Sequence, residues 1–209
     1  GVGSSDVGSV LGHNKFRSRL DVYFDKIGEA EPFPDNINMK FGRDFEPIAA
    51  DWFMEESGRK VVNDYKIRSH PKHPFMMANL DRVILDYDNE GPGVLEIKTV
   101  SEMAHRYWGD SVPLNYYAQI QHQLNVTGYT YGYFAVFVVG YVKQFLVLRV
   151  ERDKEFIDNM ENELKVFWYD NVQKRIIPDA VTASDTEKMF PIDNGNTVEA
   201  TGEMVNAYD

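Results

Sequence analysis

Residues 76–100 constrain the fold of this chain most, because they predict two strands joined by a turn. Val83–Leu85 is a short apolar run, and Val94–Val100 alternates apolar and polar side chains. Between these two segments, residues 88–93 read Asp-Asn-Glu-Gly-Pro-Gly, which is a turn composition. The pattern therefore predicts a β-hairpin at the centre of the fold.

Three charged side chains fall together on this hairpin. Asp81 opens the first strand, and Glu96 and Lys98 lie two residues apart on the second. Because side chains alternate along a strand, Glu96 and Lys98 share one face while Ile97 points to the other. Two carboxylates and a lysine at one edge are costly to bury unless a cation and an anion bind beside them. This is the layout of a metal-dependent site that cleaves phosphodiesters.

Hydrolysis of a phosphodiester needs a nucleophilic water, neutralisation of the charge that develops on the phosphate, and a stabilised leaving oxygen. Mg²⁺ held by hard oxygen ligands supplies much of this, and Mn²⁺ is able to substitute for it. Asp81 and Glu96 are the natural ligands, with the backbone carbonyl of Ile97 as a third. Lys98 would orient or deprotonate the attacking water, and we expect its pKa to fall when the metal is bound.

The composition fits one domain with a sizeable core, since the chain has 209 residues of which 43% are hydrophobic and 13% aromatic. No apolar run approaches the ~18 to 20 residues of a membrane span, and the start lacks the basic segment of a signal peptide. The absence of cysteine excludes disulfides and thiolate metal sites and fits a reducing compartment. We therefore expect a cytoplasmic protein that does not enter a membrane.

The net charge of −11 argues against a general nucleic-acid coat, but its distribution is uneven. Residues 151–209 hold 14 Asp and Glu against 6 Lys and Arg, a net of −8, which leaves −3 for residues 1–150. A local basic groove is therefore allowed beside the hairpin. We expect a single domain over residues 1–178, followed by an acidic tail or the start of an extension over residues 179–209.

The order of the expected elements implies an α/β fold, with one mixed sheet flanked by helices. The helix between the second hairpin strand and the next strand could act as a right-handed crossover. Gly3–Asp6 is a helix N-terminus whose backbone N–H groups could bind an anion. The expected helices cover residues 17–27, 39–57, 115–127 and 155–172, and the expected strands cover residues 61–67, 83–85, 94–100, 131–139 and 142–150.

Two further segments carry candidate ligand-binding side chains. Residues 101–113 contain His105, Arg106, Tyr107 and Trp108, which suit contact with phosphates and bases but suit a connecting segment equally well. The second segment, residues 70–73, has the His-X-X-His spacing of a metal site. The prolines at positions 71 and 74 prevent a regular helix there, so we expect no metal role for it.

The pattern of an Asp, fourteen residues and then Glu-X-Lys is typical of the PD-(D/E)XK nuclease superfamily, although it is weak on its own. Further motifs resemble the YqaJ-type viral recombinases and lambda exonuclease, over about residues 1–172. They are Gly3-Ser4-Ser5-Asp6-Val7 with Leu11-Gly12, Gly42-Arg43-Asp44-Phe45-Glu46 with Ala49, Trp108 with Val112-Pro113, and Tyr116-Tyr117-Ala118-Gln119-Ile120-Gln121-His122-Gln123-Leu124. The long helix of residues 155–172 matches as well.

The resemblance implies a restriction-endonuclease-like core and a role for each matched residue. Asp81, Glu96 and the Ile97 carbonyl would bind Mg²⁺, and Lys98 would act on the nucleophile. The local sequence places Glu46 on a solvated flank of its helix, whereas the resemblance makes it a helper of the metal site. The resemblance implies binding roles for three further residues: Gln119 with Tyr116 at the active-site edge, and Ser5 in a pocket for the 5′-phosphate. Arg106 is a candidate substrate contact because of the composition of residues 101–113 alone.

This sequence departs from the family in two places. Arg82 follows Asp81 where the family commonly has Gly, which puts a cation beside the metal site, either as a phosphate contact or turned away. The arginine that usually precedes the opening motif is absent because the sequence starts at Gly1. Residues upstream are therefore expected to be missing, and the 5′-phosphate pocket to be incomplete.

Three functions remain open at this point. The first is a processive Mg²⁺-dependent 5′→3′ exonuclease that acts on double-stranded DNA ends and leaves 3′ overhangs. It would be phage- or prophage-encoded, serve a single-strand annealing recombinase in recombination, and assemble as a homo-trimer. The second is an endonuclease or structure-specific nuclease on the same fold. The third is a DNA-binding module without catalysis, which the intact Asp, Glu-X-Lys set argues against.

Overall fold

The computed structural model describes residues 1–30, 34–106, 108 and 111–190. The chain divides into two compact units, Gly1–Pro178 and Asp179–Asp209. In the described part of the second unit, α7 (Ala183–Met189) begins at Thr182, whose hydroxyl accepts the backbone N–H of Asp185 at 3.1 Å. The sequence analysis expected an acidic tail or the start of an extension in this segment and named no helix there. Within the described ranges, no helix is both long and apolar enough to cross a membrane.

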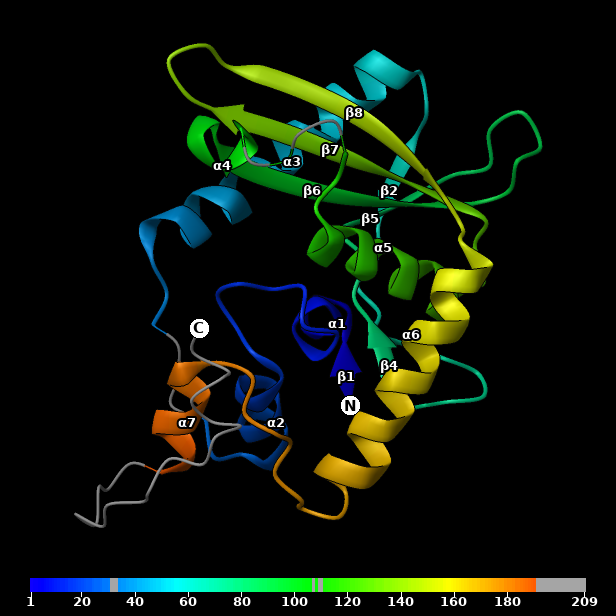
Figure 1. The fold of residues 1–209 in the computed structure, drawn as a ribbon. Helices are drawn as coiled ribbons and strands as arrows, with labels where there is room; N and C mark the ends of the chain where they lie inside the picture. Colours follow the sequence, from blue (N-terminus) through cyan, green and yellow to red (C-terminus); the bar gives the residue numbers. More distant parts are fainter. Residues whose placement is uncertain (31–33, 107, 109–110, 191–209) are drawn as a thin grey trace. The chain divides into compact units, whose positions relative to one another are not determined.

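A mixed five-stranded sheet forms the centre of the first unit (Figure 1). Its strands follow the order β2-β5-β6-β7-β8, and only the β6–β7 pair is parallel. These strands are β2 (Val61–Asn63), β5 (Arg82–Ile84), β6 (Gly93–Ser101), β7 (Tyr131–Val139) and β8 (Gln144–Glu151). The predicted hairpin is confirmed as the antiparallel pair β5–β6, in which Arg82 lies opposite Leu95.

Two helices lie in the long connection between the parallel strands β6 and β7. They are α4 (Glu102–Arg106) and α5 (Leu114–Thr127), and α5 is the predicted crossover helix. Gly128 ends α5 with a positive φ of 74°, a conformation that glycine adopts without a steric penalty. The side chains of Gln119 and Gln123 on α5 bond to Glu96 of β6, so α5 covers the face of the sheet that carries Glu96.

The opposite face of the sheet is covered by α3 (Ile37–Ser57), which begins at the cap residue Asn36. Phe53 of α3 packs with buried residues of the strands, Leu95 of β6 among them, so the Leu95 face belongs to α3. The apolar side chains of α3 are only partly buried, because Ile48 is 44% exposed and Trp52 is 37% exposed. Trp52 still packs its ring against the aromatic side chains of β7 and β8.

A second, three-stranded sheet has the order β1-β4-β3 and was not predicted as a sheet. It consists of β1 (Val2–Gly3), β4 (Met76–Ala78) and β3 (Arg68–Ser69). The strand expected over residues 61–67 is therefore wrong in extent, since β2 ends at Asn63. This small sheet leads directly into α1 (Ser4–Val10), which lies against α5.

The remaining helices of the first unit are α2, α6 and a π-helical turn. α2 (Arg19–Ile27) has Ser18 as its cap and ends at Gly28, close to the expected bounds. The helix expected over residues 155–172 is α-helical only from Lys154 to Val166, as α6, and continues as the π-helix η1 (Phe167–Val172). α6 packs against α5 and α1 through its buried apolar face.

Candidate active site

The sheet places Glu96 and Lys98 on the α5 face, as the strand period predicted. Glu96 is 3% exposed, and its Oε1 lies 2.7 Å from Nζ of Lys98. Both residues lie in the middle strand β6, which is hydrogen-bonded along its length to β7. These hydrogen bonds to β7 fix the backbone of β6, and they therefore fix the positions of the Glu96 and Lys98 side chains.

Asp81 reaches β6 at the point where β5 has ended. At the end of the β5–β6 ladder nearest Asp81, the last paired residues are Arg82 and Leu95. One residue before Arg82, Oδ2 of Asp81 accepts a hydrogen bond from the backbone N–H of Ile97 at 2.7 Å. Because the N–H and C=O of one strand residue point to the same side, the carbonyl of Ile97 also faces Asp81. Asp81, Glu96 and this carbonyl therefore offer oxygen atoms from adjacent positions.

Two glutamines of α5 hold the carboxylate of Glu96. Gln119 donates Nε2 to Oε1 of Glu96 and accepts Nζ of Lys98 at 2.9 Å on its own Oε1. Gln123 donates Nε2 to Oε2 of Glu96 at 2.7 Å and to the backbone carbonyl of Asn79 at 3.2 Å. The sequence analysis named Gln123 only as part of a motif. Its position four residues after Gln119 could have indicated that both side chains lie on the same face of the helix.

The charges of Asp81, Glu96 and Lys98 favour the binding of a cation. Burial, and then the negative charge of Glu96, raise the pKa of Asp81 to about 8. Burial alone would lower the pKa of Lys98, but the charge of Glu96 overrides it, so the Lys98 pKa lies above its usual value in the cation-free chain. The carboxylates of Asp81 and Glu96 thus share a single lysine, and a bound cation would remove the remaining repulsion between them.

The donor set tests whether a cation fits here. Asp81, Glu96 and the Ile97 carbonyl present oxygen atoms alone, which is the ligand type that Mg²⁺ and Mn²⁺ prefer. The amide of Gln123 fixes Glu96 from behind, as second-layer partners fix metal-binding carboxylates. The residues of this site therefore fit a hard divalent cation.

A cavity of about 340 Å³ connects this cluster to the N-terminal segment. Asp81, Glu96 and Gln119 line one part of it, and Ser5 and Lys26 line another. The tertiary structure thus brings the predicted 5′-phosphate residue and the predicted metal ligands into the same cavity. The sequence analysis did not name Lys26 as a site residue.

An ion-pair network forms the N-terminal wall of this cavity. Asp6 lies 2.7 Å from Nζ of Lys26 and 2.6 Å from Arg17, and it also accepts the backbone N–H of Gly3 at 3.0 Å. Burial would raise the pKa of Asp6, but the hydrogen bond from Lys26 and its charge keep it below the usual value. The sequence analysis named this helix N-terminus as a possible anion site, and the N–H of Gly3 is bonded to the carboxylate of Asp6.

A buried histidine connects the N-terminal segment to α5. Nδ1 of His122 lies 3.3 Å from the hydroxyl of Ser4, 118 residues away in the sequence. Burial lowers the pKa of His122 to about 4, so its ring is neutral near pH 7. The two walls of the cavity are thus joined by a side-chain contact that the sequence did not indicate.

The aromatic and basic residues predicted to contact DNA fall in different places. Tyr116 lies at the site, since Nζ of Lys98 is 4.9 Å from the centre of its ring, and Trp108 packs against Tyr116 at 5.5 Å. Arg106 lies outside the residues that line the cavity and pairs with Glu102 at 2.7 Å on the exposed surface of α4. Tyr107 lies outside the described residues.

Glu46 and Arg82 are paired with each other. The guanidinium of Arg82 contacts Oε1 of Glu46 and the backbone carbonyl of Asp81. Glu46 lies close enough for its charge to contribute to the raised pKa of Asp81, after burial and Glu96. Glu46 is nevertheless absent from the residues that line the cavity beside Asp81 and Glu96.

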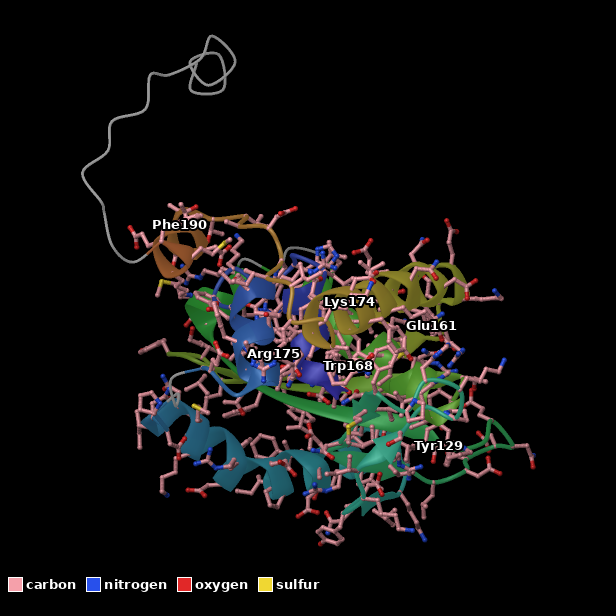
Figure 2. The ribbon with its side chains drawn as sticks, turned by 90° about the horizontal axis from the view of Figure 1, so that it is seen from below. Tyr129, Glu161, Trp168, Lys174, Arg175 and Phe190 are labelled. Atoms are coloured by element: carbon pink, nitrogen blue, oxygen red, sulfur yellow. The ribbon has the colours of Figure 1, made fainter. Side chains whose placement is uncertain are left out.

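His70 and His73 meet Glu161 of α6, which is labelled in Figure 2, so that one ligand atom from each lies within 4.8 Å of the others. The backbone N–H of His73 donates to Nδ1 of His70 at 3.1 Å, which leaves the proton of a neutral His70 ring on the Nε2 that faces Glu161. The two rings are stacked with an interplanar angle of 6°, so their in-plane lone pairs do not converge. This geometry suits a cluster of partly buried polar side chains better than a metal site.

The mixed sheet and its flanking helices form a restriction-endonuclease-like fold, and Asp81, Glu96 and Lys98 lie together on it. The family model of the YqaJ-like viral recombinase domain matches residues 1–130, and the chain belongs to this family. The uncharacterized protein YqaJ of Bacillus subtilis (strain 168) is 35% identical over 176 residues, which cover 82% of this chain and 53% of that protein. The chain thus spans about half the length of this curated relative.

Solved structures share the fold at lower sequence identity. The alkaline exonuclease LHK-Exo of Laribacter hongkongensis has a TM-score of 0.67 and 23% identity, with 83% of this chain and 88% of that chain covered. A phage-related exonuclease of Haemophilus somnus 129PT has a TM-score of 0.61 and 13% identity, with 83% and 95% covered. These similarities confirm the predicted fold class, and the family model confirms the predicted family.

Proposed function

We propose that this protein is a Mg²⁺-dependent exonuclease that degrades one strand of double-stranded DNA from its 5′ end and leaves 3′ overhangs. One observation carries the proposal: the carboxylates of Asp81 and Glu96 line the same cavity as Ser5 and Lys26. A phosphodiester and a terminal phosphate of one DNA strand would then be held at two places in one cavity. The exonucleases with the same fold support this choice of substrate.

The cation would be held by Asp81, Glu96 and the Ile97 carbonyl, and Mn²⁺ could replace Mg²⁺ there. When bound, it supplies a positive charge beside the phosphate oxygens and acidifies water. Glu96 can serve as a ligand without rearrangement, because Gln119 and Gln123 already fix its two oxygens.

Lys98 and Gln119 would act on the water and the scissile phosphate. Nζ of Lys98 donates hydrogen bonds to Oε1 of Glu96 and to Oε1 of Gln119. The charge of Glu96 raises the pKa of Lys98, and a bound cation beside Lys98 would lower that pKa. Lys98 would then accept the proton of the attacking water or donate to the phosphate. Tyr116 borders Nζ of Lys98 and would limit how the phosphate approaches it.

Recognition of the 5′ end would set the direction of digestion. Ser5 offers a hydroxyl donor and Lys26 a cation on the N-terminal wall, and a terminal phosphate carries about two negative charges. Lys26 is already paired with Asp6, so a phosphate would compete with that carboxylate for its ammonium group. Arg106 on the surface of α4 would contact the DNA backbone outside the cavity.

The description of the family supports a role in recombination, and we propose that this role is phage-type homologous recombination. We further propose a single-strand annealing recombinase as the partner and a homo-trimer as the assembly. Such an enzyme would act in the cytoplasm of a bacterial host. These features belong to the proposal together with the strand polarity.

The test uses linear double-stranded DNA labelled at either the 5′ or the 3′ end, with Mg²⁺ or with EDTA, alongside a covalently closed circle. Release of the 5′ label from linear DNA in Mg²⁺ alone, with the circle intact, would support the exonuclease and its direction. Cutting of the circle would favour an endonuclease on the same core. Cleavage of neither substrate would overturn the proposal in favour of a DNA-binding module.

A further inference from the structure

Arg82 and Glu46 meet on the side of the sheet away from the α5 glutamines. Arg82 lies directly opposite Leu95 in the antiparallel pair β5–β6, and directly opposed residues share a face. Leu95 packs with Phe53 of α3, so the side chain of Arg82 also points to the α3 face. Glu46 comes from α3 and accepts its hydrogen bond there.

The carboxylate of Glu46 is therefore already paired with a positively charged side chain, the guanidinium of Arg82. The Arg82 side chain is 12% exposed and the Glu46 side chain 32%, so the pair is largely withdrawn from solvent. The same guanidinium nitrogen contacts the backbone carbonyl of Asp81, which puts its charge directly beside a proposed metal ligand. A divalent cation that used Glu46 would have to displace the guanidinium or accept its repulsion at short range.

Resting on the function proposed above, we propose that this site binds one divalent cation, and that the Arg82 guanidinium stands in place of a second. In this arrangement Glu46 is a positioning residue that holds Arg82 and is not a metal ligand. The cation site consists of Asp81, Glu96 and the Ile97 carbonyl, and Arg82 contributes the further positive charge at the opposite side of Asp81. The role that the resemblance implies for Glu46 is thereby revised.

The experiment counts bound Mn²⁺ per chain from the loss of the free-ion electron paramagnetic resonance signal, in the presence of a double-stranded oligonucleotide with phosphorothioate linkages. The Glu96→Gln variant gives the background from other carboxylates, and its count is subtracted. We expect one Mn²⁺ for the unmodified chain and one for Arg82→Lys, which keeps the charge. We expect two for Arg82→Ala, in which Glu46 is released.

The double variant Arg82→Ala with Glu46→Gln should return to a count of one, because the released ligand is then removed. Arg59→Ala is the matched control, since Arg59 pairs with Glu90 at 2.7 Å with side-chain exposures of 11% and 32%. It removes an equally buried ion pair away from the site, and its count should stay at one. Circular dichroism of every variant confirms that the chain has folded before ions are counted.

A count of two in the unmodified chain would overturn this inference while leaving the proposed function intact. A count that stays at one in folded Arg82→Ala would also overturn it, since the guanidinium would not be what excludes a second ion. A count of zero in the unmodified chain, with the background subtracted, would instead overturn the metal site of the proposed function. The cleavage assay on labelled DNA is independent of all three counts.

Discussion

The backbone N–H of Ile97 donates a hydrogen bond to Oδ2 of Asp81 at 2.7 Å, in the place where β5 no longer pairs with β6. The end of a strand thus gives Asp81 its position, and it also leaves the adjacent carbonyl of Ile97 available to a ligand. The proposed catalytic arrangement is built from an interruption in the sheet together with the alternation of side chains along β6.

Replacement of Lys98 by Ala should abolish cleavage and leave DNA binding intact. The change removes a positive charge that acts in the transition state, and we expect the rate to fall by about 10²–10³-fold or more. Lys98 is not a metal ligand, so binding of DNA in Ca²⁺, followed by fluorescence anisotropy, should be nearly unchanged. Lys165→Ala on α6, which removes an ion pair with Glu161, serves as the control. An equal loss of binding and cleavage would contradict this role.

Replacement of Gln123 by Met should weaken cation binding by about 10–100-fold, because Glu96 then loses the donor that fixes its Oε2. Gln121→Met is the matched control. Gln121 is equally buried on the same helix, but it bonds to the backbone carbonyl of Glu151 and the backbone N–H of Asp153. Titration calorimetry with Mn²⁺ measures the effect, and similar affinities for the two variants would argue against a positioning role for Gln123.

Replacement of Ser5 by Ala should slow the cutting of 5′-phosphorylated DNA by about 10–100-fold, the loss expected for a hydrogen bond to a charged group. Cutting of 5′-hydroxyl DNA should change much less. Ser9→Ala on the same helix is the control, because Ser9 is buried and accepts a hydrogen bond from Asn14 at 3.1 Å. Equal losses on both substrates would remove Ser5 from the proposed pocket.

His122 should make the stability of the protein depend on pH between about 6.5 and 4. Its pKa is lowered to about 4 by burial, while the unfolded chain has the usual value of about 6.5. As pH falls through this window, the unfolded chain binds a proton that the folded chain excludes. The free energy of unfolding should therefore decrease, by about 3 kcal/mol over the whole window.

Urea unfolding at a series of pH values measures this dependence. The His122→Gln variant should lose most of the slope between pH 6.5 and 4, because the replaced side chain does not titrate. His13→Gln changes an exposed histidine and should retain the slope of the unmodified chain. A slope that is the same in all three proteins would show that other groups determine it.

Most of the large elements, and the shared face of Glu96 and Lys98, could be predicted from the sequence, because the signals lie close together along the chain. The turn of residues 88–93 and the alternation of Val94–Val100 place Glu96 and Lys98 on one face. Glycine 28 and glycine 58 end their helices where the pattern predicted, with φ of 79° and 70°. Strand period and helix caps are local properties, and local sequence is sufficient to specify them.

The tertiary structure alone decided which distant groups meet. The pairing of Arg82 with Glu46 spans 36 residues, and the contact of Ser4 with His122 spans 118. Sequence motifs indicated that Glu46 belongs near the site, but only the register of β5 against β6 placed its partner on the α3 face. Such contacts depend on how whole helices and strands pack together. The residues next to a side chain in the sequence do not specify that packing.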